Sequence, residues 1–256
     1  MIIYFSGTGN SAAVARGLAE RLGEPLQALM AVSPLELRFE GRRLIFVFPI
    51  YSWGVPPIVL DYIRSLNASF VEECAGRVAV WGVATCGDEV ARAPEMFRKC
   101  VVGAGLDFRG FCDVIMPNNY VLLPGFSVDP VEVERRKLSE YEKRVDAVAE
   151  KILADAPVVD VTVGSWPRLK TGVVYPLFKR WGITPSRWVA TDACVGCRKC
   201  VEVCPVKNIA MKDRQPVWGD NCMSCCGCYH VCPRNAVQYG RITRGKGQYF
   251  FPWNKK

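Results

Sequence analysis

The sequence predicts an α/β fold: a doubly wound parallel sheet with strand order 2-1-3-4-5, followed by a small α+β domain. Two observations predict the sheet. Short β-branched and aromatic runs alternate with helical patterns, and a glycine-rich turn directly follows the first run. A third observation predicts the second domain, because eight of the 13 cysteines form two identical runs late in the chain. A length of 256 residues suits one medium domain and one small one.

The first strand is expected within residues 1–6 and leads into a turn that can bind an anion. The turn consists of Ser6, Gly7, Thr8, Gly9, Asn10 and Ser11. A helix follows, so backbone N–H groups and the helix dipole can hold a phosphate without a lysine. The turn also fits the dinucleotide fingerprint, but the second strand, ending near residues 28–32, lacks the acid that would hold a ribose. The hydroxyl and amide side chains favour a terminal phosphomonoester, as in FMN.

Three further apolar runs, residues 43–50, 77–84 and 106–116, predict the third to fifth strands. In this strand order, ligands bind in the crevice at the carboxyl ends of strands one and three. The loops expected there contain Ile50, Tyr51, Ser52, Trp53 and Gly54, then Thr85, Cys86, Gly87 and Asp88, and finally Tyr120. Trp53 could stack on a planar ring or simply pack into the core. Residues 130–155 predict a long amphipathic helix that closes the domain.

The late cysteines follow the pattern Cys-x2-Cys-x2-Cys-x3-Cys-Pro twice, with each residue of the second copy 28 positions after its counterpart. The first copy contains Cys194, Cys197, Cys200 and Cys204, and the second contains Cys222, Cys225, Cys228 and Cys232. This spacing is that of bacterial two-cluster ferredoxins, in which the fourth cysteine of each run binds the other cluster. The sequence therefore predicts two [4Fe-4S] clusters, with Cys232 completing cluster I and Cys204 completing cluster II.

Two other uses of the cysteines are weaker alternatives. Structural zinc sites close with four ligands and do not need two runs of four with a trailing Cys-Pro. Disulfides need an oxidising compartment and usually an export signal. Cys226 lies outside the pattern, either as a spare thiol beside cluster II or as a replacement for Cys225. Cys74, Cys100 and Cys112 are expected to be small buried apolar residues.

Three motifs coincide in residues 1–155: the sequence SGTGNS, the loop with Tyr51, Trp53 and Gly54, and the TCGD turn at 85–88. Together they resemble a flavodoxin. The resemblance implies bound FMN, with the phosphate at the SGTGNS turn and the isoalloxazine ring between residues 50–54 and 85–88. No tyrosine follows Asp88, where many flavodoxins place a stacking ring, so one flavin face is either open or covered by Tyr120 or another domain.

The expected organisation is a flavodoxin-like domain (1–155), a packed connecting segment (156–190), a two-cluster ferredoxin domain (191–240) and a basic aromatic tail (241–256). The connecting segment is too rich in prolines and aromatic residues to be a flexible linker. The tail could touch a membrane surface or nucleic acid, or form a strap over the ferredoxin module, or dock an acidic partner. No nucleic-acid recognition motif accompanies it. The whole chain resembles the flavodoxin–ferredoxin fusion proteins of anaerobic bacteria and archaea.

The expected function is electron transfer between the clusters and FMN, to or from a partner redox protein, by a monomer or a dimer. The alternatives are an FMN-dependent reductase of a quinone, flavin or other small acceptor, and a redox sensor or a module whose clusters only stabilise the fold. No catalytic residue is assigned. His230 is the only histidine, so no Ser-His-Asp or Cys-His site is credible, and it is expected to be exposed. For Cys86, backbone contact with the flavin is expected rather than thiol chemistry.

The composition limits where the protein is expected in the cell and which partners it can have. No apolar run is long enough for a transmembrane helix, and no leader precedes the first strand. Thirteen cysteines without an export signal predict a reducing, cytoplasmic location and suit an anaerobe. The formal net charge of +8 is unusual for small acidic electron carriers and leaves the usual flavodoxin partners in doubt.

Overall fold

The computed structural model describes residues 1–182 and 184–253. Its centre is a parallel sheet with the order β2-β1-β3-β4-β5-β6, so the predicted order 2-1-3-4-5 is confirmed and a sixth strand is added. The strands are β1 (Ile2–Tyr4), β2 (Leu26–Ala28), β3 (Arg43–Pro49), β4 (Ala79–Cys86), β5 (Asp107–Ile115) and β6 (Val158–Asp160). The added strand β6 lies within the segment expected to connect the domains.

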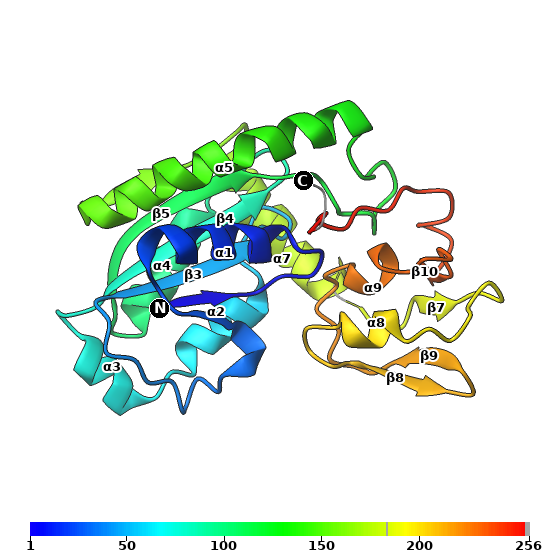
Figure 1. The fold of residues 1–256 in the computed structure, drawn as a ribbon, viewed down its shortest axis with the longest axis horizontal. Helices are drawn as coiled ribbons and strands as arrows, with labels where there is room; N and C mark the ends of the chain where they lie inside the picture. Colours follow the sequence, from blue (N-terminus) through cyan, green and yellow to red (C-terminus); the bar gives the residue numbers. More distant parts are fainter. Residues whose placement is uncertain (183, 254–256) are drawn as a thin grey trace.

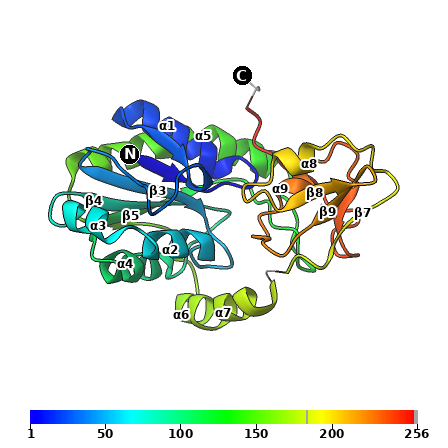
Figure 2. The ribbon, with the colours of Figure 1, turned by 90° about the horizontal axis from the view of Figure 1, so that it is seen from below.

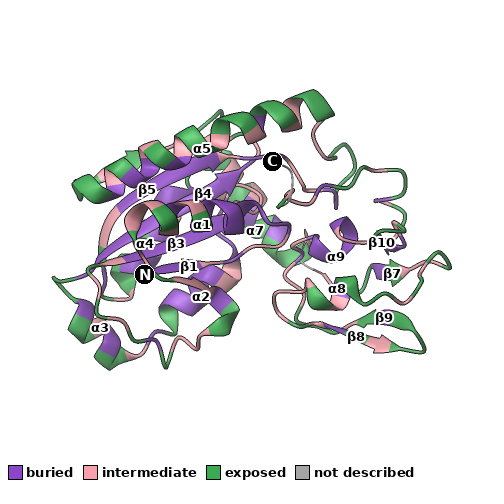
Figure 3. Cartoon of the chain, in the orientation of Figure 1, coloured by how far each residue is buried: buried purple, intermediate pink, exposed green. Residues whose placement is uncertain are grey.

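Helices cover both faces of this sheet, as Figures 1 and 2 show. One face is covered by α1 (Asn10–Leu22) and α5 (Val131–Ala154), and the other by α2 (Pro57–Arg64), α3 (Ala68–Cys74) and α4 (Ala93–Gly103). Figure 3 shows the buried residues gathered on the strands between the two helix layers. Successive β3 residues alternate between the two cores: Phe46 packs with the α2–α4 side and Val47 with the α1–α5 side. A short 3₁₀ turn, η1 (Leu29–Ala31), follows β2.

The C-terminal part is small and built from two similar halves. Strand β7 (Trp188–Ala190) pairs antiparallel with β10 (Val237–Tyr239), and β8 (Ile209–Lys212) forms a hairpin with β9 (Gln215–Trp218). One-turn helices α8 (Lys199–Glu202) and α9 (Gly227–His230) each contain the third cysteine of a run. The sequence repeat is therefore also a structural repeat.

Two segments join the parts. Residues 167–182 form a continuous helical segment, called here the bridging helix: α6 (Pro167–Leu169), the π-helical turn η2 (Lys170–Val174), α7 (Tyr175–Leu177) and the π-helical turn η3 (Phe178–Gly182). Residues 246–253 run back from the ferredoxin part to the first domain and are called here the C-terminal strap (Figure 1). None of the described helices has the length and apolar character that a membrane crossing requires.

Candidate functional site

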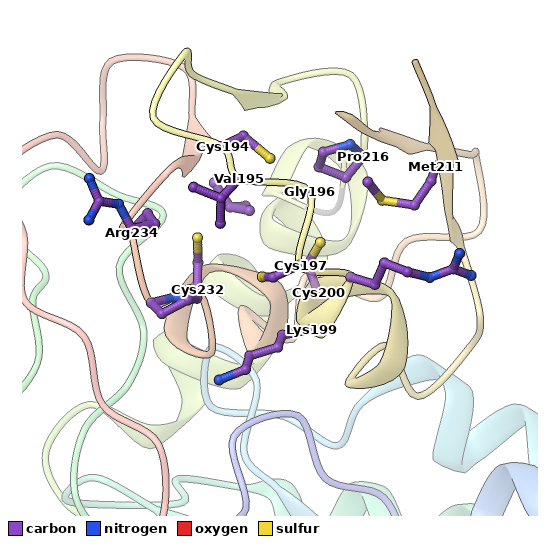
Figure 4. Close-up of a pocket in the computed structure, with 13 residues that line it drawn as sticks. Cys194, Val195, Gly196, Cys197, Lys199, Cys200, Met211, Pro216, Cys232 and Arg234 are labelled. Atoms are coloured by element: carbon purple, nitrogen blue, oxygen red, sulfur yellow. The ribbon is translucent and has the colours of Figure 1, made fainter. Parts of the chain in front are cut away.

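Four cysteines from both runs surround a first cavity in the ferredoxin part. They are Cys194, Cys197 and Cys200 of the first run and Cys232, the last cysteine of the second run. Figure 4 shows their sulfur atoms directed into the same space. This set is the one that crossed ligation requires for cluster I.

A second cavity is lined by Cys222, Cys225 and Cys228 of the second run and by Cys204 of the first. Cys226 also lines it. The repeat distinguishes Cys226 from Cys225, because 28 positions earlier Cys226 corresponds to Arg198. Both residues have left-handed backbone angles, with φ of 61° and 65°, and each precedes a one-turn helix. Cys226 thus occupies the turn position of the repeat, and Cys225 the position that corresponds to Cys197.

The same backbone donor serves the last cysteine of each run. The N–H of Asn208 donates to Sγ of Cys204, and the N–H of Ala236 donates to Sγ of Cys232, both at 3.2 Å. Such bonds favour a thiolate because they stabilise negative charge on sulfur. They fit cysteines that act as metal ligands.

Burial disfavours the charged thiolate form of these cysteines unless a metal cation binds in place of the proton. Burial raises the pKa of Cys200 to about 11 and that of Cys225 to about 12, although backbone N–H groups offset part of both shifts. A metal deprotonates a thiol outright by supplying positive charge. Among the described residues, no group of three or more His, Cys, Asp or Glu side chains is placed so that it could hold a single metal ion. The eight cysteines of the two runs line two cavities, four at each, and sets of four thiolates are those that hold [4Fe-4S] clusters.

Two indole N–H groups of the second cavity have no hydrogen-bond partner in the described part of the chain. They belong to Trp188 and Trp218, which stack with ring centroids 6.2 Å apart. Burial raises the pKa of the Cys222 and Cys228 thiols in the same cavity. A buried donor without an acceptor is costly, so both donors fit a site where cluster and thiolate sulfur would accept.

The predicted phosphate loop, residues 6–11, ends at the N-terminus of α1. Gly9 precedes the helix with φ of 100°, and the helix has neither a side-chain cap nor an acid in its first turn. Asn10 and Ser11, its first residues, are nevertheless buried. A buried helix N-terminus without a cap is unfavourable unless an anion meets its N–H groups. The loop therefore fits a phosphate.

Hydrogen bonds tie this loop to the ends of β4 and β5. Ser11 Oγ lies 2.7 Å from Thr85 Oγ1, and Asn10 Nδ2 donates to the carbonyl of Pro117 at 3.0 Å. Asn119 donates to the Thr8 hydroxyl. Within the loop, the N–H of Gly9 donates to Ser6 Oγ. The structure thus brings the phosphate loop and the turn at 85–88 together.

The two loops expected at the flavin ring also meet, because the N–H of Ile50 donates to the carbonyl of Thr85 at 2.8 Å. Between Ile50 and Gly54 the chain turns sharply, with positive φ at Ser52 and Trp53. The Trp53 indole donates to Glu89 at 2.8 Å, and the Lys170 ammonium lies over its ring.

The remaining residues of the second loop line the same edge of the sheet. Cys86 is buried, and burial raises the pKa of its thiol. Gly87 packs against the side chain of Asn118, which leaves no room for a larger residue. Asp88 lies at the exposed rim, 3.8 Å from Lys137.

Tyr51 and Tyr120 lie between the two parts of the molecule. Both hydroxyls are buried and lack a hydrogen-bond partner among the described residues, and Phe178 of the bridging helix contacts both rings. Burial raises the pKa of both phenols. Unpaired buried hydroxyls fit a site that accepts or donates hydrogen bonds to a polar ring system such as isoalloxazine.

The second cavity lies directly against the phosphate loop. A methyl group placed on Gly7 would come within 2.6 Å of the Cys225 carbonyl oxygen and 3.1 Å of its Sγ. One placed on Gly227 would come within 2.6 Å of the Gly7 carbonyl oxygen. Only glycines allow this approach of the two backbones.

His230 is buried, not exposed as expected, with only 5% of its surface accessible. The Tyr249 N–H donates to its Nδ1 at 3.0 Å, so Nε2 carries the proton and donates to the Asn119 carbonyl at 2.7 Å. Burial lowers its pKa to about 4, which keeps the ring neutral. His230 therefore joins α9, the strap and the loop that follows β5.

The C-terminal strap reaches the phosphate loop as well as the ferredoxin module. The N–H of Phe251 donates to the carbonyl of Thr8, and the Tyr249 hydroxyl donates to Asn10 Oδ1. This contact with the first domain could not be predicted from the sequence, because aromatic residues in a tail carry no signal for what they cover. Residues 254–256 of the predicted tail lie outside the described residues.

Comparisons with known proteins find a family match for the C-terminal part of the chain alone. Residues 187–233 match the family of 4Fe-4S dicluster domains. No curated protein matches the chain.

Three solved structures are similar to parts of this chain. The Trp repressor binding protein from Bacillus subtilis is 19% identical over 56% of this chain and 95% of its own, with a TM-score of 0.40. A flavodoxin from the domain Archaea is 13% identical over 59% and 96%, with a TM-score of 0.39. The two-electron reduced flavodoxin from Megasphaera elsdenii is 17% identical over 56% and 97%, with a TM-score of 0.34. These scores are low, so the fold rests on the strand order itself. The chain therefore joins an α/β domain with the strand order of the flavodoxin-like fold to a region that matches the 4Fe-4S dicluster family.

Proposed function

We propose that this chain is an electron-transfer iron–sulfur flavoprotein that exchanges electrons with a partner redox protein. Clusters pass single electrons and FMN accepts one or two, so the chain would link one-electron donors to two-electron chemistry. The observation that carries the proposal is the contact between Cys225 of the second cavity and Gly7 of the phosphate loop. We also propose a cytoplasmic location, because the cytoplasm supplies the reducing conditions that thiol ligands require.

Each site has its own set of residues. Cys194, Cys197, Cys200 and Cys232 would hold one [4Fe-4S] cluster, and Cys204, Cys222, Cys225 and Cys228 the other. The buried N-terminus of α1 and the side chains of residues 6–11 would bind the FMN phosphate. Residues 50–54 and 85–88 would hold the ring, with Tyr51 and Tyr120 as hydrogen-bonding groups at its edge.

The bridging helix covers the loop that would hold the flavin ring. This favours electron transfer through the clusters over direct reduction of a small acceptor molecule at the flavin. Thr171 of the bridging helix donates to the carbonyl of Trp53, and Tyr175 donates to that of Val55. These contacts limit the access that an FMN-dependent reductase of quinones or flavins would need. Such a reductase remains the alternative that turnover assays would reveal.

Two measurements test this proposal. Anaerobically purified protein should contain iron, sulfide and flavin, with a flavin band and a broad cluster shoulder in its absorption spectrum. Cys204→Ala should damage the second cluster although Cys204 belongs to the first run, and Cys232→Ala should damage the first. Cys226→Ala is the matched control and should keep both clusters. Electron paramagnetic resonance distinguishes the clusters, and damage in the opposite order, or absence of flavin, would refute the assignment.

A further inference from the structure

The bridging helix presents a stripe of large apolar side chains to the solvent. Trp166, which precedes it, is 75% exposed, and Leu169, Val173, Leu177 and Trp181 are 51%, 48%, 45% and 62% exposed. These residues are three or four positions apart, so they lie along one side of the helix. Figure 2 shows α6 and α7 as the outermost elements on their side of the molecule. An apolar patch of this extent marks an interaction surface.

The opposite side of the helix is fixed to the first domain, so the stripe cannot turn inward. Tyr175 and Phe178 are buried, and Phe178 packs on Tyr51 with ring centroids 6.3 Å apart. Thr171 Oγ1 donates to the carbonyl of Trp53 at 2.8 Å, and Lys170 pairs with Glu89. Rolling the helix would break these bonds and expose both aromatic rings. The stripe is therefore a permanent feature of the surface.

The charge carried by the bridging helix and the residues that flank it in sequence has a single sign. Residues 161–191 contain no Asp or Glu, and their basic residues are Arg168, Lys170, Lys179, Arg180 and Arg187. Arg168, Lys179 and Arg180 are exposed beside the stripe, whereas Lys170 is paired. The Arg180 guanidinium lies 5.2 Å from the ring centre of Trp181. A surface that binds this helix must therefore present apolar groups to the stripe and negative charge to the basic residues beside it.

We infer that the bridging helix binds the surface of an anionic lipid membrane, lying in the plane of the interface. An apolar face with basic flanks defines an interfacial helix, in which the headgroups meet the basic residues and the acyl chains meet the apolar stripe. Tryptophans at both ends, Trp166 and Trp181, suit the boundary between headgroups and acyl chains. A second copy of the chain is disfavoured, because a two-fold contact would set the same basic residues against each other.

Vesicle sedimentation of the full-length protein with its cofactors tests this inference without requiring activity. The protein should bind phosphatidylcholine vesicles containing phosphatidylglycerol about tenfold or more tightly than vesicles of phosphatidylcholine alone. The triple variant Leu169→Ser, Val173→Ser, Leu177→Ser should bind the anionic vesicles about tenfold or more weakly. An unchanged cluster absorption spectrum shows that the variant is folded.

Matched controls separate the stripe from general surface effects. Leu35, Val102 and Leu153 are 61%, 56% and 51% exposed elsewhere, and their replacement by Ser should leave binding unchanged. Replacing Arg168, Lys179 and Arg180 by Gln should weaken binding, whereas the same change at Arg135, Arg136 and Lys143 of α5 should have a much smaller effect.

Three outcomes would overturn the inference. They are no binding to either vesicle, equal binding by the stripe variant, and a concentration-dependent dimer that only the stripe variant abolishes, which would identify a second copy as the occupant.

Discussion

Individual side chains around the second cavity are arranged to stabilise negative charge on sulfur. The indoles of Trp188 and Trp218 come from two different strands, yet both reach the same set of cysteines. Hydrogen bonds to cluster sulfur are one of the levers that set reduction potential. Because such donors would stabilise the more negative, reduced state, they would raise the potential of a cluster bound at the second cavity.

Removing either donor should lower that potential. Trp188→Phe and Trp218→Phe would each remove one hydrogen bond to the bound cluster, worth about 1 kcal/mol or ~40 mV for a one-electron couple. Redox titration followed by electron paramagnetic resonance measures the shift. Trp81→Phe is the control, since Trp81 is also buried and its indole N–H has no partner among the described residues, but it lies in the sheet core. Unchanged reduction potentials in both Trp188→Phe and Trp218→Phe would show that the indoles do not face the cluster.

At the scale of elements, the junction of β1 and α1 is the feature on which the proposed flavin binding would depend. Gly9 has a left-handed backbone, and a methyl group placed on it would come within 2.6 Å of Phe251 Cβ. Any side chain at this position strains the turn and displaces the strap. To test the effect of charge at this loop, two substitutions are therefore needed that cause the same strain and differ only in charge.

Gly9→Glu and Gly9→Gln form such a pair. Both carry the same steric cost, but only Glu places a carboxylate near the phosphate. At about 4 Å and an effective dielectric of 20, the repulsion is ~4 kcal/mol, or about three decades in affinity. Fluorescence titration of the flavin should show this difference between the two variants, while the iron content stays unchanged. Equal affinities would refute phosphate binding at this loop.

Elements with strong local signals were predictable, and those made by distant contacts were not. Strands such as β3 and β4 are continuous apolar runs, and the cysteine spacing encodes both cavities because the repeat brings the runs together. Strand β6 is partly exposed, with Val159 on the surface, so it lacks the continuous buried run that marks β3 and β4. His230 was expected to be exposed because nothing near it in sequence shows that Asn119 and Tyr249 will cover it.

At the scale of the whole molecule, several contacts hold the ferredoxin part against the first domain, so we expect the two parts to move as one unit. His230 and the strap hold α9 to the loop after β5, and Lys246 donates to the carbonyls of Val121 and Leu123. These contacts supplement the close approach of Gly7 and Gly227. The ferredoxin part is therefore anchored at several independent points.

Replacing His230 tests this anchoring. His230→Phe should destabilise the strap by about 2 kcal/mol, because it removes two hydrogen bonds of ~1 kcal/mol each. Limited proteolysis should then cleave within residues 241–253 faster than in the unmodified protein. His230→Gln, which keeps a donor and an acceptor, is the control with a smaller expected effect. Cleavage at an unchanged rate would show that His230 does not secure the strap.

The rate of electron transfer within the molecule tests the central claim most directly. Photoreduction of the clusters should be followed by flavin reduction in a first-order process that depends neither on protein concentration nor on salt. The reason is that Cys225 and Gly7 remain in contact, so no docking of charged surfaces precedes transfer. A rate that rises with protein concentration or changes strongly with salt would contradict the account, because it would show two independent carriers on a tether.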